Sequence, residues 1–216
     1  MKLYLIRHTR TATPTGTCYG FLDVQLADSF ADELRSLRET MNANELNGPL
    51  RIYSSPLQRC RRLAIALATP ERTPNISWDD RLKELNFGEW EGRTWDAIQS
   101  QDAERSRDWM DHFVSARCPG GESYADLARR VGEFLHDLSA GAADSEADSV
   151  RDVTGEIPPT VIVAHGGSLR ALLAHALGLD LERGFAFDLD YGRLSCLEWD
   201  PALPPGHRGK LLYLNR

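Results

Sequence analysis

The chain opens with the stretch Lys2-Leu3-Tyr4-Leu5-Ile6-Arg7-His8-Thr9, a short apolar run that ends in an arginine–histidine pair. The arrangement recurs far downstream, where the apolar run Val161-Ile162-Val163-Ala164 leads into His165-Gly166-Gly167. In open α/β sheets, ligands bind in the crevice at the carboxyl ends of the strands. Two buried-type strands therefore each deliver a histidine to the end of a sheet where functional sites form.

Strand patterns alternate with helical patterns along the rest of the chain. The expected strands are 2–6, 51–53, 161–164, 193–199 and 211–214, and the expected helices are 29–44, 56–68, 94–112, 123–140 and 168–177. Such alternation indicates βαβ units and a largely parallel sheet. A chain of 216 residues is long enough for one α/β domain with a sizeable core. We therefore expect residues 1–216 to form a single α/β domain.

Several residues mark the ends of these elements. Ser55-Pro56 predicts a helix N-cap followed by proline at the first helical position. Ser123 is a candidate cap for the helix that follows it, and Gly178 fits a helix terminus. The segment 141–159 is small, acidic and aperiodic, so we expect a flexible surface loop there.

Composition excludes several classes of protein. The formal net charge of −7 argues against a nucleic-acid-binding face, which needs a clustered basic excess. No apolar run reaches the roughly 18 residues of a membrane span, so no membrane association is expected. The four cysteines show no metal-ligand spacing, which favours reduced thiols and a cytoplasmic location. An anionic substrate would require this acidic protein to concentrate its arginines locally.

Two arginines and two histidines at strand and helix ends suit a phosphoryl group. Arg59 follows the turn 54–58 into a helix, and guanidinium groups match phosphate oxygens bidentately. Histidine can attack phosphorus and hold the phosphoryl group covalently. A carboxylic acid would then be needed to protonate the leaving alkoxide. The segment 82–92 supplies three candidates, Glu84, Glu89 and Glu91.

An ordered set of motifs resembles the histidine phosphatase superfamily, in the branch that includes phosphoglycerate mutases. The motifs are Arg7-His8-Thr9, Ser55-Pro56-Leu57-Gln58-Arg59, Glu84 within the sequence LKELNFGEWEG, Pro119-Gly120-Gly121-Glu122-Ser123, and His165-Gly166. Each motif is weak alone, but the set is specific because it keeps the order of the family across most of the chain. Residues 16–26 and 87–92 are most similar to α-ribazole phosphatases of cobalamin biosynthesis.

The resemblance implies a phosphoglycerate mutase-like fold, which is a three-layer α/β/α sandwich with a mostly parallel sheet. It implies that His8 is the phosphorylated nucleophile, that Arg7 and Arg59 bind the phosphoryl oxygens, and that His165 stabilises the transition state. Glu84 would be the proton donor to the leaving group, and later the base that activates water. The spacing Leu-x-Glu-x-x-Phe-Gly favours Glu84 over Glu89 and Glu91. No metal or cofactor is implied.

The function predicted in this way is hydrolysis of a small phosphate monoester through a phosphohistidine, with α-ribazole 5′-phosphate as the expected substrate. A broad phosphatase for sugar phosphates or nucleotides and a catalytically weak binder of phospho-ligands are the alternatives. We expect Tyr19 and Gly20 to border the leaving-group pocket. Trp90 and Trp95 fit either the mouth of that pocket or the core.

The sequence departs from the commoner family pattern near the proposed nucleophile. Thr9 replaces the usual glycine after the histidine, and Pro14 stands where many members place an asparagine that contacts phosphate. The helix after Arg59 lacks the frequent glutamine–threonine pair. These departures concern the choice of substrate more than the core chemistry. The other histidines, such as His175 in an apolar helix, are expected to be structural or exposed.

Overall fold

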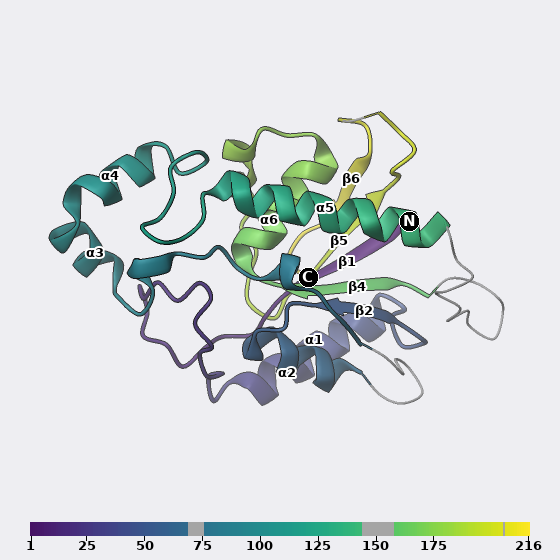
Figure 1. Ribbon diagram of the computed structural model, residues 1–216. Coiled ribbons are helices and arrows are strands. Elements are labelled where there is room, and N and C mark those ends of the chain that lie inside the picture. Colours follow the sequence, from purple (N-terminus) through teal and green to yellow (C-terminus); the bar gives the residue numbers. More distant parts are fainter. Residues whose placement is uncertain (69–75, 144–157, 205) are drawn as a thin grey trace.

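The computed structural model describes residues 1–68, 76–143, 158–204 and 206–216 and contains a six-stranded sheet of order β3-β2-β4-β1-β5-β6 (Figure 1). The strands are β1 (Lys2–Arg7), β2 (Arg51–Ser54), β3 (Ile76–Trp78), β4 (Thr160–Ala164), β5 (Leu194–Trp199) and β6 (Gly209–Tyr213). Strands β3, β2, β4 and β1 pair in parallel, and β5 and β6 add two antiparallel strands beside β1. The predicted α/β class with a mostly parallel sheet is confirmed.

Helices cover both faces of this sheet (Figure 1). They are α1 (Phe30–Ala43), α2 (Gln58–Leu67), α3 (Trp95–Gln101), α4 (Ala103–Asp111), α5 (Tyr124–Ala143) and α6 (Gly166–Leu177), with short 3-10 helices at Asp80–Leu82, Gly88–Trp90 and Leu181–Ala186. Figure 1 shows α1 and α2 on one side of the sheet and α5 and α6 on the other, with α3 and α4 beyond one end of the strands. The predicted three-layer arrangement is therefore confirmed.

The central strands are apolar on both faces because each face is covered by helices. Successive side chains of a strand point to opposite faces. Leu3 and Leu5 accordingly belong to the core cluster that contains α5 and α6, whereas Tyr4 and Ile6 belong to the cluster that contains α1 and α2. This double burial explains why β1 and β4 are short uninterrupted apolar runs in the sequence.

Strand register brings three polar segments to one edge of the sheet. Arg7 is aligned with Ala164 in the neighbouring strand, and the His8 backbone N–H donates to the Ala164 carbonyl at 3.0 Å. Ser54 is aligned with Val163, whose carbonyl accepts the Ser55 backbone N–H at 3.0 Å. The residues that immediately follow β1, β2 and β4 therefore meet at the carboxyl ends of three adjacent parallel strands.

The structure differs from the predicted elements in one helix and one additional strand. The helical pattern 94–112 forms two helices, α3 and α4, because Asp102 adopts a non-helical conformation with φ −135° and ψ 49°. The side chain of Asp102 accepts the indole N–H of the buried Trp90 at 2.9 Å. The edge strand β3, which is only three residues long, was not predicted from the sequence.

Helix caps confirm two of the three predictions. Ser123 and Asp126 bond reciprocally, since each side chain accepts the backbone N–H of the other, and Gly178 ends α6 in the left-handed region with φ 65°. Ser55 does not cap α2, because the N-cap position is Leu57, whose backbone is extended, and the helix begins at Gln58. Asp23 from a distant loop instead accepts the Gln58 backbone N–H at 2.7 Å.

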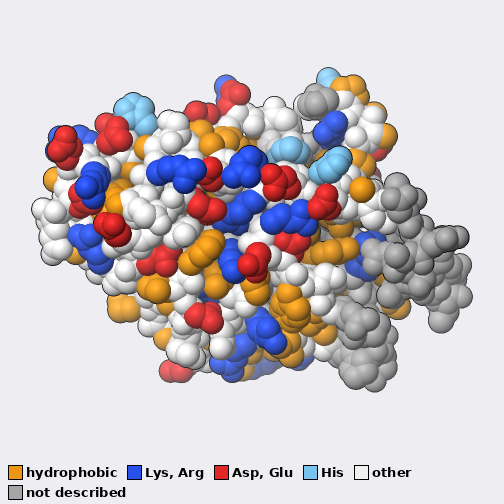
Figure 2. Space-filling model, viewed as in Figure 1, with side chains coloured by type: hydrophobic (Ala, Val, Ile, Leu, Met, Phe, Trp, Pro, Cys, Tyr) orange, Lys and Arg blue, Asp and Glu red, His pale blue; other side chains and the backbone are white. Residues whose placement is uncertain are grey.

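The helix α5 extends to Ala143, three residues into the loop predicted at 141–159. Residues 144–157 of that predicted loop lie outside the described residues. On the face seen in Figure 2, lysine and arginine side chains are interspersed with aspartate and glutamate side chains. Among the helices that the structure describes, none combines the length and apolar character needed to cross a membrane.

Candidate active site

His8 lies directly after β1 and is 1% exposed. Its Nδ1 lies 2.7 Å from the carbonyl oxygen of Thr9. A carbonyl oxygen only accepts hydrogen bonds, so this contact assigns the ring proton to Nδ1 and leaves the lone pair on Nε2. Burial and the nearby charge of Arg59 hold the pKa of His8 well below its ordinary value of 6.5. His8 is therefore a neutral imidazole at pH 7, with Nε2 available as a nucleophile.

Arg59, on α2, is fully buried and has three hydrogen-bond partners in the structure. Its Nε donates to Nδ1 of His165 at 3.1 Å, and its terminal nitrogens donate to the carbonyls of Leu22 at 2.8 Å and Gly20 at 2.6 Å. All three partners are neutral. The guanidinium charge is therefore held in place by bonds that do not neutralise it.

Arg7 places a second guanidinium group beside His8. Its Nη1 donates to the carbonyl of Leu189 at 2.6 Å, and its Cζ lies 3.6 Å from the ring centroid of Tyr191. Within the described part of the chain, its buried Nε has no hydrogen-bond partner. A buried N–H without an acceptor is costly, so this atom is suited to an acceptor oxygen of a bound molecule.

His165 follows β4 and lies at the N-terminus of α6, with its ring centroid 5.1 Å from that of His8. Both of its ring nitrogens have protein partners: Nδ1 accepts from Arg59, and Nε2 lies 2.8 Å from Oγ of Ser55. Burial and the charge of Arg59 hold the pKa of His165 well below its ordinary value. The neutral ring donates from Nε2 to Ser55, so the serine of the Ser55-Pro56 motif orients this histidine instead of capping a helix.

Glu84 reaches the same helix terminus from the other side. Its Oε2 accepts the Gly167 backbone N–H at 3.1 Å, and its Oε1 accepts the Leu85 N–H at 3.0 Å. A Cβ atom at Gly167 would lie 2.3 Å from Oε1 of Glu84, so glycine is required for this close approach. The carboxyl group therefore lies against the first turn of α6, two residues after His165.

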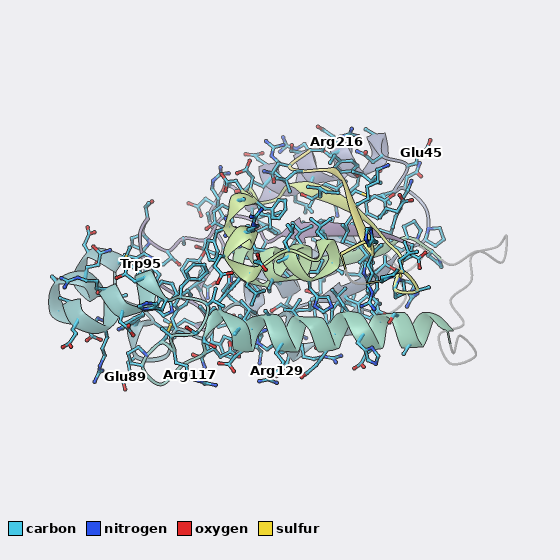
Figure 3. The ribbon with its side chains drawn as sticks, turned by 90° about the horizontal axis from the view of Figure 1, so that it is seen from above. Glu45, Glu89, Trp95, Arg117, Arg129 and Arg216 are labelled. Atoms are coloured by element: carbon cyan, nitrogen blue, oxygen red, sulfur yellow. The ribbon has the colours of Figure 1, made fainter. Side chains whose placement is uncertain are left out.

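The two competing carboxylates occupy different surroundings. Glu91 accepts the backbone N–H groups of Phe21 at 2.7 Å and Phe87 at 3.0 Å, so its carboxylate joins two loops. Glu89 is exposed and lies on the outside of the molecule (Figure 3). Of the three glutamates in this segment, Glu84 is the one bonded to the helix that begins next to His165.

Two tyrosines lie beside the arginines. Tyr19 lies with its ring centroid 5.0 Å from Cζ of Arg59, and its hydroxyl is 3.1 Å from that of Tyr191. The ring of Tyr191 is 5.4 Å from that of His8. Gly20 contributes its carbonyl to Arg59. Tyr191 escaped the sequence analysis because nothing in the segment before β5 distinguishes it from a loop residue.

Trp90 belongs to the core, since it is fully buried and packs against other aromatic rings. Trp95 is stacked on Trp109 with ring centroids 5.7 Å apart and packs against the same core cluster. The two tryptophans therefore lie in or against the core cluster that also contains Leu85, the residue after Glu84.

Thr9 and Pro14, two of the three departures from the family pattern, have different surroundings. Thr9 is fully buried, whereas Pro14 is exposed and its carbonyl accepts the Thr17 N–H at 3.2 Å.

Comparison with known families supplies the decisive observation. The family model described as "Histidine phosphatase superfamily (branch 1)" matches residues 3–205. This chain belongs to the histidine phosphatase superfamily. Family membership and its phosphatase relatives identify the protein as a phosphoric monoester hydrolase.

Similar proteins differ in the substrates that their names give. A glucosyl-3-phosphoglycerate phosphatase of Mycolicibacterium vanbaalenii is 33% identical over an alignment covering 84% of this chain and 76% of that protein. An adenosylcobalamin/α-ribazole phosphatase of Escherichia coli K12 is 25% identical and covers 92% and 90%. The crystal structure of the α-ribazole phosphatase from Shigella flexneri has the same fold, with a TM-score of 0.82, 23% identity and coverage of 100% and 96%.

The buried histidines predict a dependence of stability on pH. In the unfolded chain a histidine binds a proton near pH 6.5, whereas His8 and His165 stay neutral in the folded protein because their pKa values are lowered. The unfolded state therefore binds more protons below pH 6.5, and the free energy of unfolding decreases as the pH is lowered. The slope is up to about 1.4 kcal/mol per pH unit for each histidine.

Urea unfolding between about pH 7 and about pH 5 measures this slope. The double variant His8→Asn/His165→Asn should show a smaller slope than the native protein, because asparagine does not titrate. Equal slopes would contradict the neutral state assigned to the two rings.

Proposed function

We propose that this protein hydrolyses small phosphate monoesters through a phosphohistidine formed on Nε2 of His8. The observation that supports this most directly is the environment of His8, a buried neutral imidazole between two guanidinium groups with neutral hydrogen-bond partners. A phosphoryl dianion matches the two charges of Arg7 and Arg59. The unsatisfied Nε of Arg7 then gains a phosphoryl oxygen as its acceptor.

In the first step, the Nε2 lone pair of His8 attacks phosphorus and the bond between phosphorus and the ester oxygen breaks. The Nδ1–H bond to the Thr9 carbonyl stabilises the positive charge that develops on the ring. Glu84, in its protonated form, gives its proton to the leaving alkoxide. Arg7 and Arg59 stabilise the negative charge on the equatorial oxygens of the transition state.

In the second step, Glu84 is a carboxylate and removes a proton from a water molecule that attacks the phosphohistidine. The phosphorus–nitrogen bond breaks, inorganic phosphate leaves, and His8 returns to its neutral form while Glu84 is protonated again. His165 assists both steps by orienting Arg59 through its Nδ1, and its Nε2–H, which donates to Ser55 in the structure, is the group that can donate to a phosphoryl oxygen.

For the substrate, we propose a leaving group that carries a ring and hydroxyl groups, with α-ribazole 5′-phosphate as the first candidate. Tyr19 and Tyr191 place two aromatic rings and two hydroxyl groups beside the arginines, and aromatic faces stack on flat or ring-shaped ligands. The E. coli relative supports this candidate. The higher identity to the mycobacterial relative supports a second, glucosyl-3-phosphoglycerate.

In this proposal the whole chain acts as one histidine phosphatase domain in the cytoplasm, with Tyr19 and Gly20 at the leaving-group pocket. A broad phosphatase for sugar phosphates or nucleotides would use the same residues for the chemistry. A catalytically weak binder of phospho-ligands would have no use for Glu84, since binding needs no proton donor.

A kinetic comparison of phosphate monoesters tests the proposal. The panel contains α-ribazole 5′-phosphate, glucosyl-3-phosphoglycerate, a nucleoside monophosphate and the linear ester glycerol 3-phosphate, each with excess chelator. We expect turnover, with the highest kcat/KM for a ring-bearing ester, and a loss of at least about 10³-fold in the His8→Ala variant. Thermal stabilisation by these esters without any hydrolysis would support the binder instead. Equal kcat/KM for all four esters would contradict the role given to the two tyrosines.

The Glu84→Gln variant tests the assignment of the proton donor. For an alkyl phosphate, whose leaving alkoxide is strongly basic, we expect kcat/KM to fall by about 10² to 10⁴-fold. For an aryl phosphate such as p-nitrophenyl phosphate, whose leaving phenolate needs no proton, kcat/KM should fall much less. The constant kcat/KM is the relevant one because it reports the first phosphoryl transfer, before Glu84 acts as a base.

The matched control is Glu89→Gln, which removes an exposed carboxylate from the same segment and should leave both substrates unaffected. If Glu89→Gln or Glu91→Gln produced the selective loss instead, the assignment of the acid to Glu84 would be wrong.

A further inference from the structure

The turn Pro119–Ser123, one of the family motifs, packs against the segment that carries Glu84. The backbone N–H of Glu89 donates to the Pro119 carbonyl at 2.8 Å, and the backbone N–H of Glu122 donates to the Asn86 carbonyl at 2.8 Å. A Cβ atom at Gly121 would lie 2.3 Å from the Asn86 carbonyl oxygen, so the two backbones meet without space for a side chain. The turn is therefore in direct backbone contact with residues 86–89.

Glu122, in this turn, forms a bidentate ion pair with Arg130 on α5. Nε and Nη2 of Arg130 donate to the two carboxylate oxygens of Glu122 at 3.0 Å and 2.9 Å. The two side chains are only 13% and 21% exposed. Oε2 of Glu122 also accepts the Asn86 backbone N–H at 3.1 Å. The pair thus connects α5 to the loop that follows Glu84.

The remaining donors of Arg130 bond to the backbone on the other side of Glu84. Its Nη1 donates to the carbonyls of Arg81 at 2.6 Å and Lys83 at 2.7 Å, and its Nη2 also donates to the carbonyl of Glu84 itself at 2.7 Å. A guanidinium group has five N–H donors, and the structure gives Arg130 five acceptors. Three of these acceptors are the carbonyls of Arg81, Lys83 and Glu84, and the other two are the carboxylate oxygens of Glu122 in the turn that packs against this segment.

We infer that Arg130 and Glu122 are positioning residues that hold the carboxyl group of Glu84 against the N-terminus of α6. This inference rests on the proposed role of Glu84 as proton donor. The Gly167 and Leu85 amides orient the carboxyl group itself, whereas Arg130 and Glu122 fix the backbone from which its side chain extends. A displaced backbone would move the proton away from the ester oxygen, and a misplacement of about 1 Å can cost about 10²-fold in rate.

Lysine cannot replace Arg130 in this arrangement. An ammonium group has three donors around one nitrogen and cannot span two carboxylate oxygens and three carbonyls. Arg130→Lys therefore keeps the positive charge on α5 but cannot form the five hydrogen bonds of the guanidinium group. A change in rate then reports the positioning of Glu84 and not a loss of charge. Glu122→Gln is the complementary variant, because it keeps the size of the side chain and gives Arg130 a single carbonyl acceptor in place of the carboxylate.

The adjacent Arg129 provides a matched control. Its side chain is 66% exposed and lies on the outward side of α5, where it pairs with Asp126 and Glu133 (Figure 3). Arg129→Lys is the same substitution one residue away on the same helix, and in the described part of the chain the ion pairs of Arg129 are with Asp126 and Glu133, not with the Glu84 segment. It should leave catalysis by the enzyme unchanged.

The experiment compares kcat/KM for p-nitrophenyl phosphate and for an alkyl phosphate in the native enzyme and in Arg130→Lys, Glu122→Gln and Arg129→Lys. We expect Arg130→Lys to lower kcat/KM for the alkyl ester by about 10 to 100-fold and to leave the aryl ester within about threefold. Glu122→Gln should show the same selectivity. In the Glu84→Gln background, the addition of Arg130→Lys should not lower the ratio of kcat/KM for the alkyl ester to kcat/KM for the aryl ester any further, because both changes impair the same proton transfer.

A loss of the same factor for both esters in Arg130→Lys would overturn the inference, since that pattern indicates a general structural effect. An unchanged ratio of kcat/KM for the alkyl ester to kcat/KM for the aryl ester in both Arg130→Lys and Glu122→Gln would overturn it as well. Thermal unfolding shows which variants are folded, and Glu122→Gln carries the test if Arg130→Lys is not. Failure of the proposed function is distinguishable, because Glu84→Gln itself would then show no selectivity between the two esters.

Discussion

The confinement of two guanidinium charges beside one neutral imidazole is the constraint on which the rest of the site depends. Arg7 and Arg59 bond to carbonyl groups and a ring nitrogen, so their charges stay available to an anion. The burial of His8 and these same charges lower the pKa of its imidazole, which keeps the ring neutral at pH 7. Two cationic groups that remain available to an anion and a neutral imidazole with a free lone pair are thus consequences of one arrangement.

The fold produces this arrangement from the ends of three parallel strands. The residues after β1, β2 and β4 converge at one edge of the sheet, and α6 begins immediately at the end of β4. The proposed acid comes from elsewhere, on the loop that follows the short edge strand β3. That loop is held by the Pro119–Ser123 turn, by α5 and by an aromatic cluster containing Trp90, so distant parts of the chain contribute to one proton transfer.

The sequence predicted every strand except β3, together with the layers and the residues that meet at the sheet edge, because buried strands and ordered motifs leave strong local patterns. It did not predict the division of the helix at Asp102, which depends on a bond to the indole of Trp90. It assigned Ser55 to a helix cap, although its hydroxyl bonds to His165, 110 residues away. Tyr191 and the contacts of Arg130 with the Glu84 segment were missed for the same reason: their partners are distant in the sequence.

Detection of the covalent intermediate tests the central claim most directly. The Glu84→Gln variant is mixed with an aryl phosphate and quenched in alkaline denaturant, because phosphohistidine is stable to base and labile to acid, and its peptides are then analysed by mass spectrometry. The account predicts one phosphoryl group on the peptide containing His8, lost on acid treatment and absent from His8→Ala. Turnover with no protein-bound phosphate, or phosphate on another residue, would contradict it.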